Sequence, residues 1–310
     1  MKQKIVITGG AGFIGSHLVE EGVARGYEVT VLDDLSSGAE KNIVSQAKFV
    51  RGSIQDLALL EEVFAGAETV FHLAALISVP ESMKEKKRYM EMNTLGALNV
   101  LEAAVRSKVK NFIFSSSAAV YGDNLISPKR ENLSPEPLSP YALNKLDGEY
   151  LAEMFARETG LNAVSLRYFN VFGPRQNPRS AYAAAVPIFM DRALKNEPLV
   201  IYGEGEQTRD FVYVKDVVQA NFLAANSAEK LKSVEKKIFN VASGRVTTIN
   251  DLVRLILKIT GSTSTIQYLS PRPGDIKHSQ ASNQKIVETL GFKPQFDLEQ
   301  GLLNLYSKTC

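Results

Sequence analysis

The chain has 310 residues, of which 45% are hydrophobic and 23% are charged, a composition typical of globular proteins that argues against disorder. Its 36 Lys and Arg residues nearly balance its 34 Asp and Glu residues, and the net charge of +2 argues against nucleic acid or an anionic membrane as a main partner. No apolar run approaches the roughly 18 residues of a membrane span.

The cysteine and histidine content argues against a disulfide and against a metal site. The single cysteine, Cys310, leaves no internal disulfide and no Cys-based zinc site. The three histidines, His17, His72 and His278, are too scattered to predict a metal site. The apolar run after the N-terminal lysines is shorter than the roughly 7–15 residues of a signal-peptide core. We therefore expect a metal-free cytoplasmic protein, and an enzyme in particular.

The first half of the chain alternates short β-branched segments with longer segments of helical periodicity. We expect strands at Lys4–Thr8, Glu28–Leu32, Lys48–Arg51, Thr69–Leu73, Asn111–Ser115 and Asn162–Tyr168. We expect helices at Phe13–Arg25, Leu57–Phe64, Tyr89–Arg106 and Ala142–Glu158. This alternation predicts an α/β fold of the Rossmann type, a doubly wound parallel sheet with helices on both faces.

The pattern becomes less regular after Pro174. Helices are expected around Pro187–Lys195, at Ile249–Thr260 and near Gln284–Gly291. Strands are expected at Leu199–Tyr202, Phe211–Val214, Phe239–Val241 and near Thr265–Tyr268. We therefore expect two domains: a sheet domain of residues 1–173, to which segments near 211–243 return, and a smaller α/β domain of residues 174–310.

A glycine-rich turn joins the first predicted strand to the first predicted helix. Gly9, Gly12 and Gly15 form the pattern G-x-x-G-x-x-G. Glycine permits the tight turn and lets the backbone approach a pyrophosphate, which then sits at the positive end of the helix. The alternative, an ordinary glycine turn, is weakened because both the strand and the helix that the motif requires are present.

Two acidic residues, Asp33 and Asp34, end the next strand, about 20 residues beyond the glycines. A carboxylate at this place accepts hydrogen bonds from the adenosine ribose hydroxyls and repels the additional phosphate of NADP. The sequence therefore predicts a dinucleotide site for NAD.

A tyrosine and a lysine stand four residues apart at the start of a predicted helix, so that both face the same side. Lys145 can lower the pKa of the Tyr141 phenol, which must fall by about three units for the phenol to act as a base at neutral pH. Ser117 follows the predicted strand at Asn111–Ser115, at the strand end that borders a ligand crevice in such sheets. Taken alone, a Tyr-x-x-x-Lys pair is more often a surface feature; the glycine cradle upstream favours a catalytic role.

These segments together resemble the extended short-chain dehydrogenase/reductase family, and within it the UDP-sugar 4-epimerases. The matching segments cover nearly the whole chain: GGAGFIGSH, HLAA, SSSAAVYG, PYALNK, LRYFNVFGPRQ, YGEGEQTRDFVYVKD, FNVASG and RPGD. His17 lies on the first turns of the phosphate helix, and we interpret it as structural.

The resemblance implies an NAD-dependent reaction without net oxidation. Tyr141 would take the proton from the sugar 4-hydroxyl while C4 gives a hydride to NAD⁺, and the 4-keto sugar would turn before the hydride returns to its other face. Ser117 would assist the proton transfer and Lys145 would bind the nicotinamide ribose. The first domain would then bind NAD and the second would bind the UDP-sugar.

The resemblance also implies which residues bind each ligand. The cofactor would be held by Gly9, Gly12, Phe13, Ile14, Gly15, Asp33, Asp34, Ser36, Ser37, Gly38, Ser53, Ile54, Leu73, Ala74, Ala75, Tyr141, Lys145, Tyr168 and Phe169. The substrate would be held by Ser78, Ser117, Tyr141, Asn170, Val186, Tyr202, Gly203, Gln207, Arg209, Arg272, Asp275 and Ser279. Within this set, the two arginines would bind the diphosphate side through bidentate hydrogen bonds.

One position departs from the family pattern. The family usually has Gly-Asp-Ile where this chain has Gly52-Ser53-Ile54. A serine hydroxyl therefore replaces the carboxylate that would accept a hydrogen bond from the adenine amine. We expect weaker retention of the cofactor and an unchanged reaction.

Two alanines narrow the reaction. Related dehydratases have acidic residues after the active-site Ser/Thr, where this chain has Ala118 and Ala119, and related decarboxylases place a glutamate nearby. Because alanine cannot transfer a proton, both reactions are disfavoured.

The size of one residue bears on the sugar. Ser279 occupies a place where the family has a bulky tyrosine in enzymes restricted to UDP-glucose and UDP-galactose. The small serine leaves room for an acetamido group and favours UDP-GlcNAc and UDP-GalNAc, with UDP-Glc and UDP-Gal also accepted. The alternatives are a UDP-glucuronate 4-epimerase and, from another class, a non-catalytic NAD-sensing protein.

The resemblance further implies a homodimer formed through the helices near Tyr89–Arg106 and Ala142–Glu158.

Overall fold

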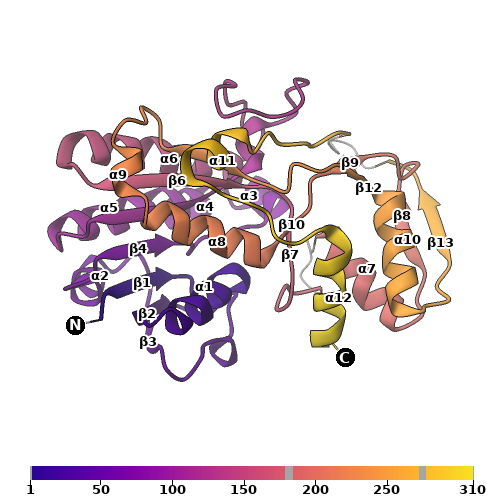
Figure 1. The fold of residues 1–310 in the computed structure, drawn as a ribbon, viewed down its shortest axis with the longest axis horizontal. Helices are drawn as coiled ribbons and strands as arrows, with labels where there is room; N and C mark the ends of the chain where they lie inside the picture. Colours follow the sequence, from indigo (N-terminus) through magenta and orange to yellow (C-terminus); the bar gives the residue numbers. More distant parts are fainter. Residues whose placement is uncertain (1, 179–183, 272–276, 310) are drawn as a thin grey trace.

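The computed structural model describes residues 2–178, 184–271 and 277–309. A seven-stranded parallel sheet forms its larger part, with strand order β11-β6-β5-β4-β1-β2-β3 (Figure 1). The predicted doubly wound α/β fold is thereby confirmed. The seven strands are β1 (Lys4–Thr8), β2 (Glu28–Asp33), β3 (Lys48–Arg51), β4 (Thr69–His72), β5 (Asn111–Ser117), β6 (Asn162–Tyr168) and β11 (Ile238–Val241).

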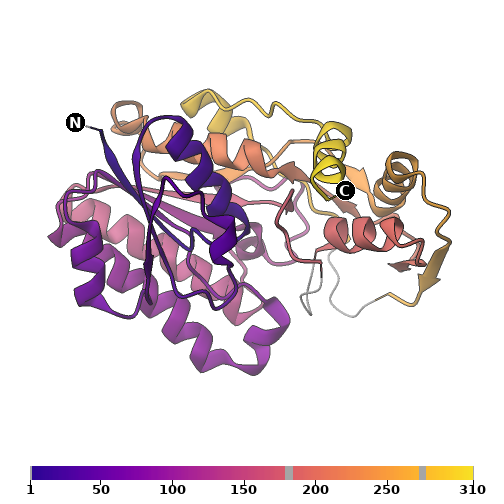
Figure 2. The ribbon, with the colours of Figure 1, turned by 90° about the horizontal axis from the view of Figure 1, so that it is seen from below.

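Alternate side chains of the strands enter two hydrophobic cores, one on each face of the sheet. Ile5 and Ile7 of β1 face one core, which is closed by α1 (Phe13–Ala24), α8 (Val214–Ala225) and α11 (Gln284–Leu290). Val6 faces the other, closed by α2 (Leu57–Phe64), α5 (Gly96–Arg106) and α6 (Pro140–Thr159). Figure 2 shows the two helix layers on opposite sides of the sheet. The strand order reverses between β1 and β4, which opens a crevice at the carboxyl ends of the strands.

A smaller region packs beside the sheet around a core of its own (Figure 1). It contains α7 (Ala185–Leu194), β8 (Leu199–Tyr202), α10 (Ile249–Thr260), β13 (Ile266–Leu269) and α12 (Leu298–Thr309). Two short strand pairs lie between the regions: β7 (Val171–Phe172) with β10 (Val212–Tyr213), and β9 (Thr208–Arg209) with β12 (Thr247–Thr248). The remaining short elements are η1 (Glu40–Asn42), α3 (Val79–Lys84), α4 (Lys86–Tyr89), η2 (Met90–Leu95), η3 (Ala118–Tyr121) and α9 (Ala228–Leu231).

The helical stretch predicted near Tyr89–Arg106 is present, but its first part has an unexpected geometry. The chain forms α4, then the π-helical turn η2, and only then α5. Within η2 the Asn93 side chain accepts a hydrogen bond from the Leu76 amide at 2.8 Å and donates one to the Leu76 carbonyl at 2.9 Å. The wider π-helical turn directs the Asn93 side chain toward the backbone of Leu76. Apolar periodicity alone could not predict this geometry.

Four α-helices of the described residues lie outside every helix predicted from the sequence and outside the stretch near Tyr89–Arg106: α3, α8, α9 and α12. The strand predicted at Phe211–Val214 ends at Tyr213, and α8 begins directly at Val214. Across the described ranges, no helix is long and apolar enough to cross a membrane.

Candidate active site

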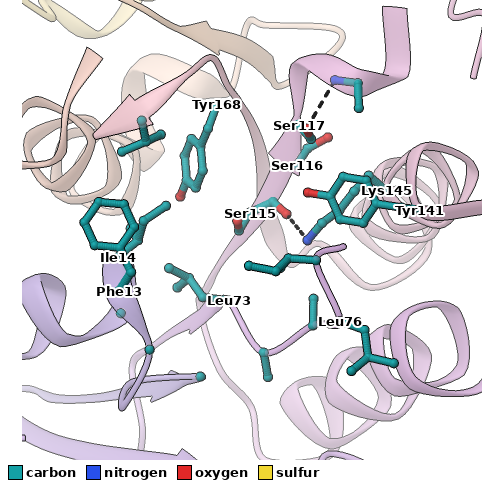
Figure 3. Close-up of a pocket in the computed structure, with 18 of the residues that line it drawn as sticks. Phe13, Ile14, Leu73, Leu76, Ser115, Ser116, Ser117, Tyr141, Lys145 and Tyr168 are labelled. Atoms are coloured by element: carbon teal, nitrogen blue, oxygen red, sulfur yellow. Dashed lines mark hydrogen bonds between the residues drawn. The ribbon is translucent and has the colours of Figure 1, made fainter. Parts of the chain in front are cut away.

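A cavity of about 520 Å³ lies at the carboxyl ends of the central strands. Its walls come from the loop after β1, the ends of β4, β5 and β6, and the start of α6. Figure 3 shows Phe13 and Ile14 on one side of this cavity and Tyr141 and Lys145 on the other. The space is of the size that proteins use for small organic ligands and lies at the point where such sheets bind them.

The glycine loop is too tightly packed to carry side chains at two of its positions. A Cβ on Gly15 would lie 2.2 Å from the Gly9 carbonyl oxygen, and one on Gly9 would lie 2.6 Å from the Ala74 amide. Gly9 also has φ of +73°, which glycine adopts without strain. Gly12 precedes α1 and supplies no side-chain cap, so the first amides of that helix are open to an anion. This loop fits a dinucleotide pyrophosphate.

Asp33 ends β2 and lies against the same loop. Its carboxylate accepts hydrogen bonds from the amides of Ala11 at 2.9 Å and Leu35 at 2.8 Å. Burial raises the pKa of Asp33, and these two hydrogen bonds oppose the rise. The carboxylate therefore braces the glycine loop at the wall of the cavity, and each of its oxygens can accept a further hydrogen bond.

Tyr141 and Lys145 project from the first turns of α6 toward the end of β5 (Figure 3). Ser139 caps this helix by accepting a hydrogen bond from the Ala142 amide, and Pro140 occupies its first position. The Lys145 ammonium donates to the Ser115 carbonyl at 2.7 Å, and the Ser117 hydroxyl, which accepts a hydrogen bond from the Ala119 amide at 3.2 Å, lies near the Tyr141 phenol. The structure thus brings the three predicted catalytic residues to one place.

Burial dominates the electrostatics of this cluster. It lowers the pKa of Lys145 to about 8, and it lowers the pKa of His72, with a contribution from Lys145, to about 3. The Tyr141 pKa is raised by burial and lowered by the nearby Ser117 hydroxyl. Formation of a phenolate therefore depends on positive charge brought close to Tyr141, and Lys145, whose Nζ lies 5.9 Å from the Tyr141 ring centre, supplies part of it.

Most of the predicted ligand-binding residues line this one cavity. They are Gly9, Gly12, Phe13, Ile14, Gly15, Asp33, Asp34, Ser36, Ser37, Ile54, Leu73, Ala74, Ala75, Ser117, Tyr141, Lys145, Tyr168, Phe169, Asn170, Arg209 and Ser279. His17 lies on α1, and its ring forms hydrogen bonds with the Pro174 carbonyl and with Arg175, in keeping with the structural interpretation.

Several predicted residues do not line the cavity. Ser53 accepts a hydrogen bond from the Gln55 amide, Ser78 caps α3, and Gln207 donates to the Tyr202 carbonyl. Also outside the cavity wall are Gly38, Val186, Tyr202 and Gly203. Arg272 and Asp275 lie outside the described residues.

The cavity also has lining residues that sequence reasoning missed. They include Leu76, Met92, Ser115, Tyr121, Lys129 and Gln176. Ser115 and Tyr121 fall within the matched SSSAAVYG segment and could have been found there. Met92 depends on the π-helical turn and Lys129 on the folding of a proline-rich insert, so no local signal points to either.

The chain matches the NAD dependent epimerase/dehydratase family over residues 5–242. The chain belongs to this family. It is therefore an NAD-dependent enzyme, and the glycine loop, the open end of α1 and Asp33 provide a site that fits the cofactor.

The relatives span the full length of the chain. A UDP-glucose 4-epimerase of Thermotoga maritima, solved with UDP-glucose, has a TM-score of 0.93 and 42% identity and covers 99% of this chain and 98% of its own. A UDP-N-acetylglucosamine 4-epimerase of Methanobrevibacter ruminantium, in complex with UDP-N-acetylmuramic acid, has a TM-score of 0.93 and 41% identity, covering 100% and 99%. A UDP-N-acetyl-alpha-D-glucosaminuronate decarboxylase of Bacillus cytotoxicus is 34% identical, covering 97% and 96%.

Proposed function

We propose that the protein is a UDP-hexose 4-epimerase that interconverts UDP-GlcNAc with UDP-GalNAc and also accepts UDP-Glc and UDP-Gal. The observation on which this rests is the meeting of Tyr141, Lys145 and Ser117 in one cavity with a dinucleotide cradle. Residues 1–173, with the segments near 211–243, form the NAD-binding domain in this proposal, and residues 174–310 form the UDP-sugar domain.

The chain's own residues handle the proton of the reaction. The Tyr141 oxygen takes the proton of the sugar 4-hydroxyl and later returns it, while the nearby Ser117 hydroxyl orients the same proton. The Lys145 ammonium, fixed by the Ser115 carbonyl at 2.7 Å, favours the phenolate. When bound, NAD supplies a reversible acceptor for the C4 hydride.

The residues beside Ser117 favour epimerisation over dehydration or decarboxylation. Ala118 and Ala119 both line the cavity, at the place where an acid or base for elimination would have to stand. Their methyl groups cannot move a proton. This supports an epimerase although one relative is named as a decarboxylase.

The sugar side of the cavity supports a neutral sugar with room for an acetamido group. Ser279 lines the cavity and is held there by its amide, which donates to the Thr208 carbonyl at 3.1 Å. A uronate would need a cation for its carboxylate. The buried Lys129 lines the cavity, but its ammonium already donates to the carbonyls of Asn124 and Ile126, so the glucuronate alternative is less favoured.

We further propose a homodimer through α6 and η2. Leu143, Tyr150 and Met154 repeat along one face of α6 and are 42%, 54% and 42% exposed, and Leu95 of η2 is 49% exposed. An apolar stripe on two adjoining helices is typical of a protein interface. Met154→Glu should convert a dimer to a monomer in light scattering; a wild-type monomer would contradict the proposal.

The activity is tested by incubating the purified protein separately with UDP-GlcNAc, UDP-Glc and UDP-GlcA, with and without added NAD⁺. Proton NMR at the anomeric position distinguishes each substrate from its 4-epimer. We expect UDP-GalNAc and UDP-Gal to appear. Conversion of UDP-GlcA alone would favour the glucuronate alternative, and no conversion of any sugar would contradict the proposed function.

A further inference from the structure

A buried ion pair lies behind the catalytic cluster and has no part in the chemistry described above. The Glu149 carboxylate on α6 accepts from Arg167 Nε at 2.8 Å and Nη2 at 2.6 Å, and Arg167 lies on β6. The two residues are 1% and 2% exposed. Removing both charges from water is expensive, and such a pair often adds little net stability compared with apolar residues of the same size.

Glu149 continues the catalytic face of its helix. Tyr141, Lys145 and Glu149 follow each other at intervals of four residues along α6, so they face the same side. The same Glu149 oxygen that bonds Arg167 Nε also accepts from the Ser116 hydroxyl at 2.5 Å. The carboxylate thus ties α6 to the ends of two strands, β5 and β6.

Ser116 occupies a sensitive place on β5. Its neighbour Ser115 supplies the carbonyl that holds the Lys145 ammonium, and its other neighbour, Ser117, lies near the Tyr141 phenol at the cavity wall. The bond from Ser116 to Glu149 therefore fixes the strand between the two contacts that orient the catalytic side chains.

Arg167 extends this tie to the cavity wall. Its guanidinium lies 4.7 Å from the centre of the Tyr121 ring, and Tyr121 lines the cavity. The next residue of β6, Tyr168, lines it as well. Loss of the Glu149 charge would leave a buried guanidinium without its counterion beside these two walls.

We propose that Glu149 is a positioning residue that, through Ser116 and Arg167, sets the register of β5 and β6 against α6 and so the contacts of Tyr141 and Lys145. This inference rests on the proposed epimerase function. Errors of about 1 Å in such contacts can reduce a rate by about 100-fold.

The test compares the holoenzyme with three variants, each assayed for kcat, KM of the UDP-sugar and bound NAD. Glu149→Gln keeps the side-chain size and removes the charge; we expect kcat to fall about 10- to 100-fold, with KM and NAD content unchanged within about twofold. Ser116→Ala removes the hydrogen bond between Ser116 of β5 and Glu149 of α6, and it should lower kcat by about 3- to 10-fold. Glu153→Gln is the matched control one turn further along α6, where Glu153 pairs with Arg157 near the surface, and it should behave as wild type.

The outcomes separate the inference from the proposed function. If the wild type epimerises no UDP-sugar, the proposed function fails. If the wild type is active and Glu149→Gln has an unchanged kcat, the positioning role is overturned. It is also overturned if Glu149→Gln loses NAD and its KM rises as much as its kcat falls, because the variant then affects binding. Should Glu149→Gln fail to fold, Ser116→Ala decides: an unchanged kcat overturns the inference, and a lowered kcat with unchanged KM supports it.

Discussion

The two sides of the cavity are built in different ways. The cofactor side comes from one continuous motif, in which the loop Gly9–Gly15 joins β1 to α1 and meets Asp33 at the end of the next strand. The side that we propose for the sugar is assembled from segments far apart in the chain: Arg209 and Ser279 both line it because residues 208–210 lie beside residues 277–281. Asp210 holds this junction by accepting hydrogen bonds from Ser243, Gly244 and Ala281.

In the proposed assignment, a short motif defines the cofactor site, whereas the substrate site needs the whole fold. Backbone geometry and a helix end suffice to bind a pyrophosphate. Selection of a sugar depends on the size of single side chains, and their positions depend on packing between segments far apart in the chain. The following changes test this difference, from the largest expected effect to the smallest.

Tyr141→Phe tests the chemistry where the two sides meet. Without the phenolic oxygen the 4-hydroxyl has no base, and general base catalysis contributes about 10²- to 10⁴-fold. We expect kcat to fall about 1,000-fold, with NAD and UDP-sugar binding retained in fluorescence titrations. Tyr27→Phe, just before the amino end of β2 and away from the cavity, is the control. Full activity of Tyr141→Phe would show that another group is the base, whereas a wild type that binds NAD without turnover would favour the NAD-sensing alternative.

Gly15→Ala tests the cofactor side. Its Cβ would lie 2.2 Å from the Gly9 carbonyl, so the loop must move, at a cost of about 1–3 kcal/mol in stability. We expect a lower Tm and a loss of NAD affinity of more than tenfold, measured by calorimetry. Gly160→Ala has no atom within 4 Å of its Cβ, and should retain NAD. Equal NAD affinity in the two variants would contradict the tight cradle.

Ser279→Tyr tests the sugar side. A phenol ring would fill the space proposed for the acetamido group, so kcat/KM for UDP-GlcNAc should fall about 10- to 100-fold relative to UDP-Glc. Ser279→Ala keeps the residue small and should leave the ratio unchanged. An unchanged ratio in the tyrosine variant would show that Ser279 does not face the sugar.

The protonation of Asp210 and its replacement by asparagine test the junction between residues 208–210 and 277–281. Burial raises its pKa to about 6, against the hydrogen bonds from Ser243, Gly244 and Ala281. Below about pH 6 the protonated carboxyl has one acceptor fewer for these donors, so KM for the UDP-sugar should rise a few-fold as the pH falls through 6. Asp210→Asn should show the higher KM at neutral pH and no inflection near 6. A flat KM profile in the wild type would contradict this role.

The sequence predicted more of the residues on the proposed cofactor side of the cavity than of the other residues and elements that form it. The glycine loop, Asp33 and the Tyr141–Lys145 pair were readable because their spacing follows from one turn or one helix face. The π-helical turn at Met90–Leu95 was not, because it depends on a bond between Asn93 and a loop distant in sequence. Helix α12 was missed because its apolar residues pack on α10 and β10, which the sequence pattern does not place. Glu149 was missed because only the fold brings Ser116 and Arg167 to it.

The most direct test of the account follows the hydrogen at C4. UDP-GlcNAc labelled with deuterium at C4 is incubated with the enzyme in ordinary water, and the UDP-GalNAc formed is examined by NMR and mass spectrometry. The account predicts that the deuterium is retained at C4 with inverted configuration, because a hydride leaves and returns within one site while Tyr141 moves only the hydroxyl proton. Loss of the deuterium to solvent, or formation of no UDP-GalNAc, would contradict it.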